Sequence, residues 1–194
     1  EHGPDAAPLD REWLDTNGRG GYASSTLCQC HTRKYHGLLV ANLSSPPGRY
    51  VLLSKFEDSL LFLGREHFLS CHRYPGVFFP GSFFLRGFEL EDGPVFLYEA
   101  RHTPGEASRG AWARESREKE GAATFRLRQS VRMVAGEDAV LIRYDLESCP
   151  APAVLRLRPF LAYRGQHELS RRNPYVRNGT EPVPNGFRIA PYQG

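Results

Sequence analysis

The segment EWLDTNGRGGYASSTLCQCHTRKYHGLLVA, residues 12–41, is the stretch around which the chain is organised. It begins beside a tryptophan and ends in an apolar run, Leu38–Ala41, which is typical of a buried strand. Between these ends, an Asn-Gly pair and a Gly-Gly pair permit positive φ angles and close approach of the backbone. The segment is therefore predicted to be a shaped loop whose base is fixed by the strand 37–41.

The same loop carries a concentration of polar side chains. Arg33, Tyr35 and His36 supply a guanidinium, a phenol and an imidazole within four positions. Such groups bind hydroxyl-rich or anionic ligands. They can equally brace the loop itself, with Arg33 holding carbonyls or a carboxylate and His36 capping a turn, and the sequence leaves both interpretations open. The residues predicted to form a binding site are Asn17, Gly20, Gly21, Tyr22, Arg33, Tyr35, His36 and, further along the chain, Tyr74.

Outside this segment, short strands alternate with turns. In residues 125–133 every second position faces one way and is apolar, except for Gln129, while arginines dominate the other face. In 154–160, Leu155 and Leu157 are expected to point inward. Similar patterns predict strands at 35–43, 49–55, 59–63, 67–71, 87–90, 95–99, 140–146 and 187–190. No segment favours a helix, so the sequence predicts an all-β fold, a large antiparallel sandwich.

Two stretches differ from this pattern. Residues 73–87 are rich in Pro, Gly and Phe, which is typical of an aromatic-packed crossing between sheets and also of a platform for sugar rings. Tyr74 is the better candidate for a hydrated site, because its hydroxyl group needs a partner. Residues 100–123 combine glycines with a run of charges and are predicted to be a mobile surface insertion.

Composition excludes several classes of protein. The 194 residues, 40% hydrophobic and 24% charged, suit a soluble globular protein of one domain, 1–194. No apolar run approaches the roughly 18 residues of a membrane span, and no leader is evident, so a cytoplasmic location without membrane contact is expected. The first residue, Glu1, is not methionine, which suggests that the true start lies upstream.

Four cysteines, Cys28, Cys30, Cys71 and Cys149, are expected to be reduced. Cys28 and Cys30 with nearby histidines are zinc-ligand types, and Cys71-His72 could complete a set. The Cys-x-Cys spacing is tighter than structural zinc sites normally use. Buried thiols acting as small hydrophobic side chains are therefore predicted, with no metal and no cofactor.

Two motifs carry a family resemblance. Residues 17–24, NGRGGYAS, and 32–41, TRKYHGLLVA, are similar to the N-terminal domain of prokaryotic glycogen debranching enzymes of the amylo-α-1,6-glucosidase type. Further matches follow in the same order over most of the chain: 49–55, Glu57, 74–76, 80–81, 133–136, 140–144, 157–159, Arg164 and His167. The resemblance implies a β super-sandwich similar to the galactose-mutarotase fold. It also implies that the catalytic carboxylates lie in a C-terminal α-helical toroid, which this chain is expected to lack.

The resemblance thus implies a domain that packs on the catalytic domain of the same polypeptide and helps to shape or bind an α-glucan such as glycogen or limit dextrin. Hydrolysis of a glycosidic bond needs two flanking carboxyl groups. The acids of this chain occupy predicted turns and polar strand faces, which favours solvated surface groups: Glu57, Asp58, Glu91, Asp92, Glu137 and Asp138. The isolated chain is predicted to be non-catalytic.

Two functions of other classes remain as alternatives. A stand-alone carbohydrate-binding module would bind glucan by itself through exposed aromatic side chains. A zinc-stabilised nucleic-acid-binding domain would use the arginine-rich strands, since all but three of the 25 basic residues are arginines. The net charge of only +3 and the scatter of these arginines argue against a nucleic-acid partner.

Overall fold

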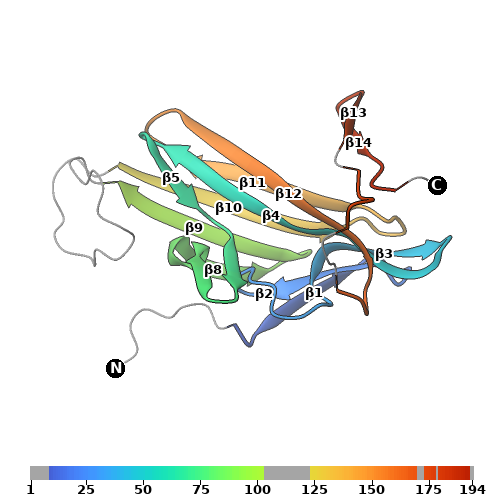
Figure 1. Cartoon of the computed structure of the whole chain (residues 1–194). Coiled ribbons are helices and arrows are strands. Elements are labelled where there is room, and N and C mark those ends of the chain that lie inside the picture. Colours follow the sequence, from blue (N-terminus) through green and yellow to red (C-terminus); the bar gives the residue numbers. More distant parts are fainter. Residues whose placement is uncertain (1–8, 103–122, 170–172, 178, 193–194) are drawn as a thin grey trace.

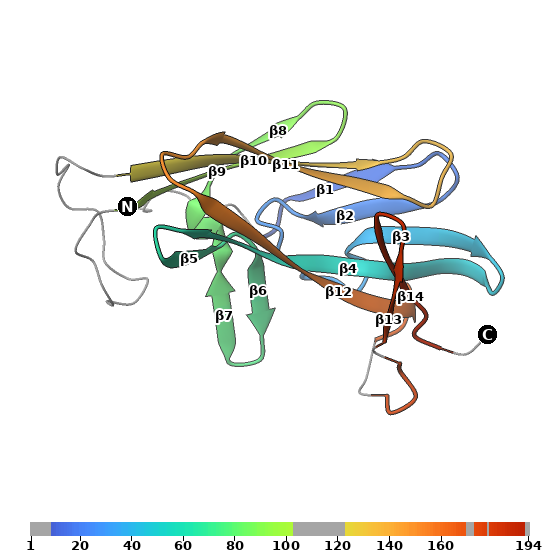
Figure 2. The same ribbon diagram turned by 90° about the horizontal axis from the view of Figure 1, so that it is seen from above.

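The computed structural model describes residues 9–102, 123–169, 173–177 and 179–192, and these form two packed antiparallel sheets (Figures 1 and 2). The first sheet has the order β1-β2-β3-β4-β12, and β5 also pairs with β4. Its strands are β1 (Glu12–Thr16), β2 (Tyr22–Thr26), β3 (Gly37–Ser44), β4 (Pro47–Phe62), β5 (Arg65–Phe68) and β12 (Ala153–Gly165). The second sheet has the order β11-β10-β9-β8. Its strands are β8 (Leu85–Leu90), β9 (Pro94–His102), β10 (Ala123–Met133) and β11 (Val140–Ser148).

Smaller elements lie outside the two large sheets. One hairpin joins β6 (Cys71–Tyr74) to β7 (Val77–Pro80), and it projects from the layers in Figure 2. A second hairpin pairs β13 (Thr180–Val183) with β14 (Gly186–Ile189). A 3₁₀ turn, η1 (Gly81–Phe84), leads into β8. The described residues thus confirm the predicted all-β class and the antiparallel sandwich.

The core lies between the two sheets. Phe62 from β4 packs edge-on against Phe125 from β10, with 5.8 Å between ring centroids, and Trp13 from β1 packs against Phe96 from β9 at 6.0 Å. The period of two in β10 is confirmed, because Phe125, Leu127, Gln129, Val131 and Met133 are all buried. Each fully buried aromatic or branched side chain contributes roughly 1.5–3 kcal/mol of hydrophobic stabilisation, so this interface holds the sheets together.

Several details of the sequence interpretation are wrong. The predicted loop contains two strands, β1 and β2, which pair as a hairpin. Residues 49–55 and 59–63 are not separate strands but parts of β4, which runs unbroken through Pro47–Phe62 because both neighbouring strands supply ladder partners. Leu157, expected to point inward, is 41% exposed, since β12 lies at an edge of the sheet where one face is left uncovered.

The predicted insertion at 100–123 lies almost entirely outside the described residues. Its two ends, however, belong to regular strands. Ala100–His102 completes β9, and Ala123 begins β10 opposite His102. The hairpin β9–β10 therefore extends further than the strand predicted at 95–99.

Candidate functional site

Asn17 connects the two sheets at one end of the sandwich. Its side chain is 3% exposed, and its Oδ1 accepts hydrogen bonds from the backbone N–H groups of Arg19 (2.8 Å) and Gly21 (2.9 Å). Its Nδ2 donates to the carbonyl of Glu137 (2.8 Å) and to Asp138 Oδ1 (3.3 Å), across the gap to the β10–β11 turn. All four bonding positions of this amide are thus used within the domain. Its geometry is that of a brace between two turns.

The glycines after Asn17 serve the same brace. A Cβ atom on Gly21 would lie 2.5 Å from Asn17 Nδ2, and one on Gly20, whose φ is +88°, would lie 3.0 Å from Asn42 Nδ2. Arg49 Nε also donates to the Gly20 carbonyl at 2.7 Å. The close backbone approach that the glycines predicted is therefore made to side chains of this domain.

Arg33 and His36 share one carboxylate, that of Glu12 on β1. Arg33 Nε lies 2.8 Å and His36 Nε2 3.2 Å from Glu12 Oε1. His36 Nδ1 accepts from the backbone N–H of Thr32 at 3.1 Å, so its proton is on Nε2. Burial, opposed by Glu12, lowers the pKa of His36, and its exposure is only 2%. His36 is thus a neutral internal brace, whereas the Arg33 side chain is 63% exposed.

Tyr22 and Tyr35 meet a segment that is distant in sequence, the end of β12 and the turn after it. Tyr22 Oη donates to the Tyr35 carbonyl (3.0 Å), and Tyr35 Oη lies 3.3 Å from His167 Nδ1. Lys34 Nζ donates to the His167 carbonyl (2.9 Å), and Arg164 Nη2 to the Lys34 carbonyl (2.5 Å). We call this surface the polar rim. It consists of Tyr22, Lys34, Tyr35, Arg164, Gln166 and His167.

The sequence interpretation found only part of this rim. Tyr22 and Tyr35 were predicted site residues, but Arg164 and His167 were noticed only as family matches and Gln166 was missed. The signal that could have found Gln166 and His167 was their polar character in a turn directly after a strand, whereas Arg164 lies within β12. Tyr74 lies on the β6–β7 hairpin instead, where its ring stacks on that of His72 with centroids 6.0 Å apart. Its exposure of 48% keeps it available to solvent.

A buried carboxylate, Asp58, was predicted to be solvated, and the structure overturns this prediction. Asp58 is 2% exposed in the middle of β4, and its Oδ2 accepts hydrogen bonds from Tyr144 Oη (3.0 Å) and Gln129 Nε2 (3.2 Å). Gln29 also donates to Gln129 Oε1 and to Tyr98 Oη. Burial raises the pKa of Asp58 to about 6. This internal network joins both sheets to the loop after β2.

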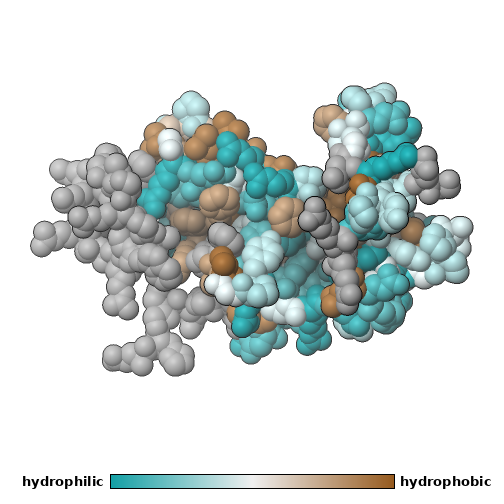
Figure 3. All heavy atoms as spheres, in the orientation of Figure 1, coloured by the Kyte–Doolittle hydropathy of each residue, from teal (hydrophilic) through white to brown (hydrophobic). Residues whose placement is uncertain are grey.

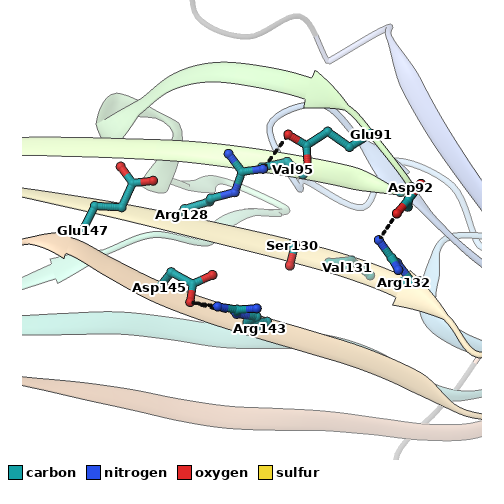
Figure 4. A pocket seen from close by; sticks show the side chains of 11 residues that line it. Glu91, Asp92, Val95, Arg128, Ser130, Val131, Arg132, Arg143, Asp145 and Glu147 are labelled. Atoms are coloured by element: carbon teal, nitrogen blue, oxygen red, sulfur yellow. Dashed lines mark hydrogen bonds and ion pairs between the residues drawn. The ribbon is translucent and has the colours of Figure 1, made fainter.

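A cluster of charged side chains lies on the outer face of the second sheet, in a shallow depression of about 570 Å³ (Figure 4). Arg128 pairs with Glu91 (2.7 Å), Arg132 with Asp92 (2.9 Å) and Arg143 with Asp145 (2.8 Å). Because each of these guanidinium groups already has a carboxylate partner, the arginine face offers little net charge to a phosphate backbone. The observation weighs against the nucleic-acid alternative.

The described residues show neither an evident metal centre nor a membrane segment. Among them, no set of three or more His, Cys, Asp or Glu side chains is arranged to hold a metal ion. No helix of this part of the chain has the length and apolar character needed to cross a membrane.

Several acidic side chains form ion pairs with arginines. Besides the pairs above, Glu57 bonds to Arg158, and Glu66 lies 2.7 Å from Arg156.

Comparison with known proteins agrees with the motifs. A family model described as "Glycogen debranching enzyme N terminal" matches residues 11–194. No individual curated protein and no solved structure gave a significant match. The matched range includes the Asn17 turn, the polar rim and both sheets. The chain therefore belongs to the family of glycogen debranching enzyme N-terminal domains.

Proposed function

We propose that this domain packs on the catalytic domain of a glycogen-debranching α-1,6-glucosidase and that its polar rim contacts the α-glucan substrate. The observation that carries the proposal is the construction of the rim. It gathers phenol, imidazole, amide and guanidinium groups from two segments, and backbone carbonyls hold several of them in place. Tyr35 is 39% exposed, so its ring edge and hydroxyl remain accessible.

Such a surface suits a sugar ligand for two reasons. Hydroxyl-rich ligands need both donors and acceptors, which Tyr35, Gln166 and His167 supply, and the tyrosine rings offer apolar faces. Because the rim is held by bonds within the domain, little side-chain freedom is lost on binding. His36 and Asn17 contribute indirectly in this proposal, since both are buried and hold the turns in place.

Exposed apolar side chains support packing against a further domain. They gather on β11, on β12 and in the segment around β13–β14, and a groove of about 850 Å³ runs between β12 and that segment. Figure 3 shows hydrophobic (brown) side chains along the upper border of the molecule, over β12 and β5. Large exposed apolar areas mark interaction surfaces. The residues are Leu141, Leu146, Val154, Leu157, Leu161, Leu169, Tyr175, Phe187 and Tyr192.

A cytoplasmic location is part of the proposal. All four cysteines are free thiols, which is the usual state in a reducing compartment. The proposed partner, glycogen, is consistent with that location.

The isolated chain is expected to release no glucose from glycogen, limit dextrin or panose. Among the residues that the structure describes, the acids lack the pairing of one proton donor with one nucleophile or base that hydrolysis requires, because Asp58 is buried and Glu57 is bound to Arg158. Glucose release by the purified chain is measured against a heat-inactivated sample. Release above that background, lost on mutation of any one acid, would refute the non-catalytic role.

Substrate contact is tested in a polypeptide that contains both this domain and the catalytic domain. Tyr35→Ala and His167→Ala are each expected to lower kcat/KM for α-1,6 branches about two- to tenfold, since one neutral hydrogen bond contributes about 0.5–1.5 kcal/mol. Arg33, beside the rim and 63% exposed, would make a charge-assisted bond to a sugar hydroxyl, so Arg33→Ala is expected to have a larger effect. Arg132→Ala, on the outer face of the second sheet, is the matched control and should leave kcat/KM unchanged.

The same variants separate binding from bracing. His36→Ala is expected to lower the melting temperature, because it leaves the backbone N–H groups of Thr32 and Arg33 without their acceptor and removes one of the two partners of Glu12. If Tyr35→Ala and His167→Ala also lower only the melting temperature, the rim is a brace and the proposed contact is wrong. Tight binding of malto-oligosaccharides by the isolated chain would instead favour a stand-alone carbohydrate-binding module.

A further inference from the structure

Three of the four cysteines lie together beneath the loop after β2. Cys28, Cys30 and Cys71 are 4%, 0% and 0% exposed and form a small cluster of their own. The Cys71 side chain packs against both other cysteines in this cluster, and its thiol interacts with their thiols. Cys28 and Cys30 belong to the loop, whereas Cys71 begins β6. The cluster therefore joins two segments that are distant in sequence.

The loop is shaped so that its two thiols flank one turn. Gln29 has a φ of 55°, an uncommon left-handed conformation for a residue with a side chain. Thr26 Oγ1 accepts from the Cys30 N–H (3.0 Å), donates to the Cys30 carbonyl (2.8 Å) and lies 3.3 Å from Cys28 Sγ. The Gln29 side chain enters the Asp58 network through Tyr98. The thiols are thus held in a fixed arrangement against Cys71.

The surroundings of the cluster favour a thiolate on the loop. The hydrogen bond from Cys71 lowers the pKa of Cys28 to about 6, and the same kind of bond lowers that of Cys30 to about 7. Both bonds raise the pKa of Cys71 itself. Lys55 Nζ donates to the Cys71 carbonyl at 2.8 Å, so its ammonium group lies beside the cluster. The thiolate is the form of cysteine that reacts with peroxides.

We propose that Cys28 and Cys71 are a redox-responsive pair that a hydroperoxide converts into a disulfide. Cys28 is the member of the cluster with any exposure, and hydrogen peroxide is small enough to reach it there. Cys71 packs against Cys28 in the cluster, so its sulfur is placed to form the disulfide with the oxidised Cys28. Cys30 holds the Thr26 hydroxyl in place through its backbone and is not part of the product.

The reaction proceeds in two steps. The Cys28 thiolate attacks one peroxide oxygen, the O–O bond breaks, and hydroxide leaves while Cys28 becomes a sulfenic acid. Cys71 then attacks that sulfur, so that the S–S bond forms and the S–O bond breaks, and the thiol proton leaves with the hydroxyl as water. Each sulfur loses one electron, and the peroxide gains both. The hydroxide of the first step takes up the proton that Cys28 released on ionising.

The product would tie the 27–31 loop covalently to β6. That loop continues directly into residues 32–36, which carry Arg33, Tyr35 and the His36 brace. Oxidation is therefore expected to restrain the base of the segment that forms one side of the polar rim. The thiol chemistry itself does not depend on the proposed contact with glucan.

The test is treatment of the purified chain with a small molar excess of hydrogen peroxide, followed by alkylation with iodoacetamide in denaturant. Two of the four thiols are expected to become resistant to alkylation, and dithiothreitol should restore both. Trypsin cuts after Arg19, Arg33, Arg65 and Arg73, so Cys28 and Cys71 fall in different peptides, 20–33 and 66–73. A cross-linked pair of these two peptides, absent after reduction, is the expected product.

Single variants assign the bond within that product. Cys28→Ser and Cys71→Ser should each abolish the cross-link, whereas Cys30→Ser and the control Cys149→Ser should retain it. Four alkylatable thiols after peroxide treatment of the unsubstituted chain, or added oxygen without a cross-link, would overturn the proposal. So would a cross-link that survives Cys28→Ser and disappears in Cys30→Ser. Because the unsubstituted chain already gives a decisive result, the test stands even if one serine variant fails to fold.

Discussion

Asn17→Asp is expected to lower the free energy of unfolding by about 3–5 kcal/mol, the range found when a buried charge is left without a partner. The substitution changes one atom of the side chain and almost none of its volume. Its effect is therefore attributable to hydrogen bonding and charge, not to packing. Urea unfolding, followed by tryptophan fluorescence, measures it, because Trp13 is buried in the folded chain.

The reason lies in what surrounds the amide. Asn17 Nδ2 donates to the carbonyl of Glu137 at 2.8 Å and to the carboxylate of Asp138 at 3.3 Å. An aspartate would place a negatively charged oxygen against both acceptors, in a position that is 3% exposed. A protonated aspartate can still donate one hydrogen bond. The destabilisation relative to the unsubstituted chain should therefore shrink as the pH is lowered.

Asn42→Asp is the matched control for this prediction. Asn42 Nδ2 donates to the carbonyl of Arg19 in the same turn at 3.0 Å, but its side chain is exposed. The same chemical change there should cost less than about 1 kcal/mol, because water replaces the lost bond. Equal effects at the two positions would show that the link between the turns adds nothing to stability.

The role of Asn17 also explains how far the sequence could predict the site. The Asn-Gly and Gly-Gly pairs correctly indicated a shaped turn, because positive φ and close approach are local properties. What the turn approaches is not local: the partners of Asn17 are Glu137 and Asp138, which lie in the β10–β11 turn of the other sheet. The same limit hid the contact between Tyr35 and His167.

The fold shows a similar division. Alternating residues in β10 predicted its buried face correctly, since that pattern depends only on the pleat of one strand. The polar residues within β4 suggested that the strand is broken there. The strand continues, because Tyr144 and Gln129, on two other strands, donate hydrogen bonds to the buried Asp58 carboxylate. A sequence pattern does not reveal a partner of that kind. Burial of a polar residue is decided by the whole sandwich.

Asp58 leads to the second large effect, a pH dependence of stability. Burial raises the pKa of Asp58 in the folded chain to about 6 from an ordinary value of 3.8, although the bond from Tyr144 and the charge of Lys55 oppose the shift. The folded chain therefore holds a proton that the unfolded chain has released between about pH 4 and pH 6. The contribution of this group to stability is complete below pH 4 and is lost as the pH rises through about 6. A shift of about two pKa units corresponds to about 3 kcal/mol.

Asp58→Asn isolates this contribution because the amide is neutral at every pH and nearly equal in shape. The Oδ1 atom of the asparagine can still accept hydrogen bonds from Tyr144 and Gln129. Ser70, which hydrogen-bonds to Asp58, lies close enough for its hydroxyl to accept a hydrogen bond from the new Nδ2 group. Near pH 7 the variant is expected to be the more stable of the two by up to about 3 kcal/mol, and near pH 4 the two should converge. Asp58→Ala should be less stable than Asp58→Asn throughout, by about 2–4 kcal/mol, because it leaves Tyr144 Oη without an acceptor and opens a cavity.

The decisive quantity is the difference in unfolding free energy between the unsubstituted chain and Asp58→Asn, measured in urea at several pH values from 4 to 7. Taking this difference cancels groups that titrate equally in both proteins. A difference that grows with pH across this window assigns the titration to Asp58. Two parallel curves would mean that the carboxylate remains ionised inside the sandwich, and the hydrogen bonds from Tyr144 and Gln129 would then outweigh the cost of its burial. A buried carboxylate linking two sheets would in that case be a stabilising tie at neutral pH instead of a cost.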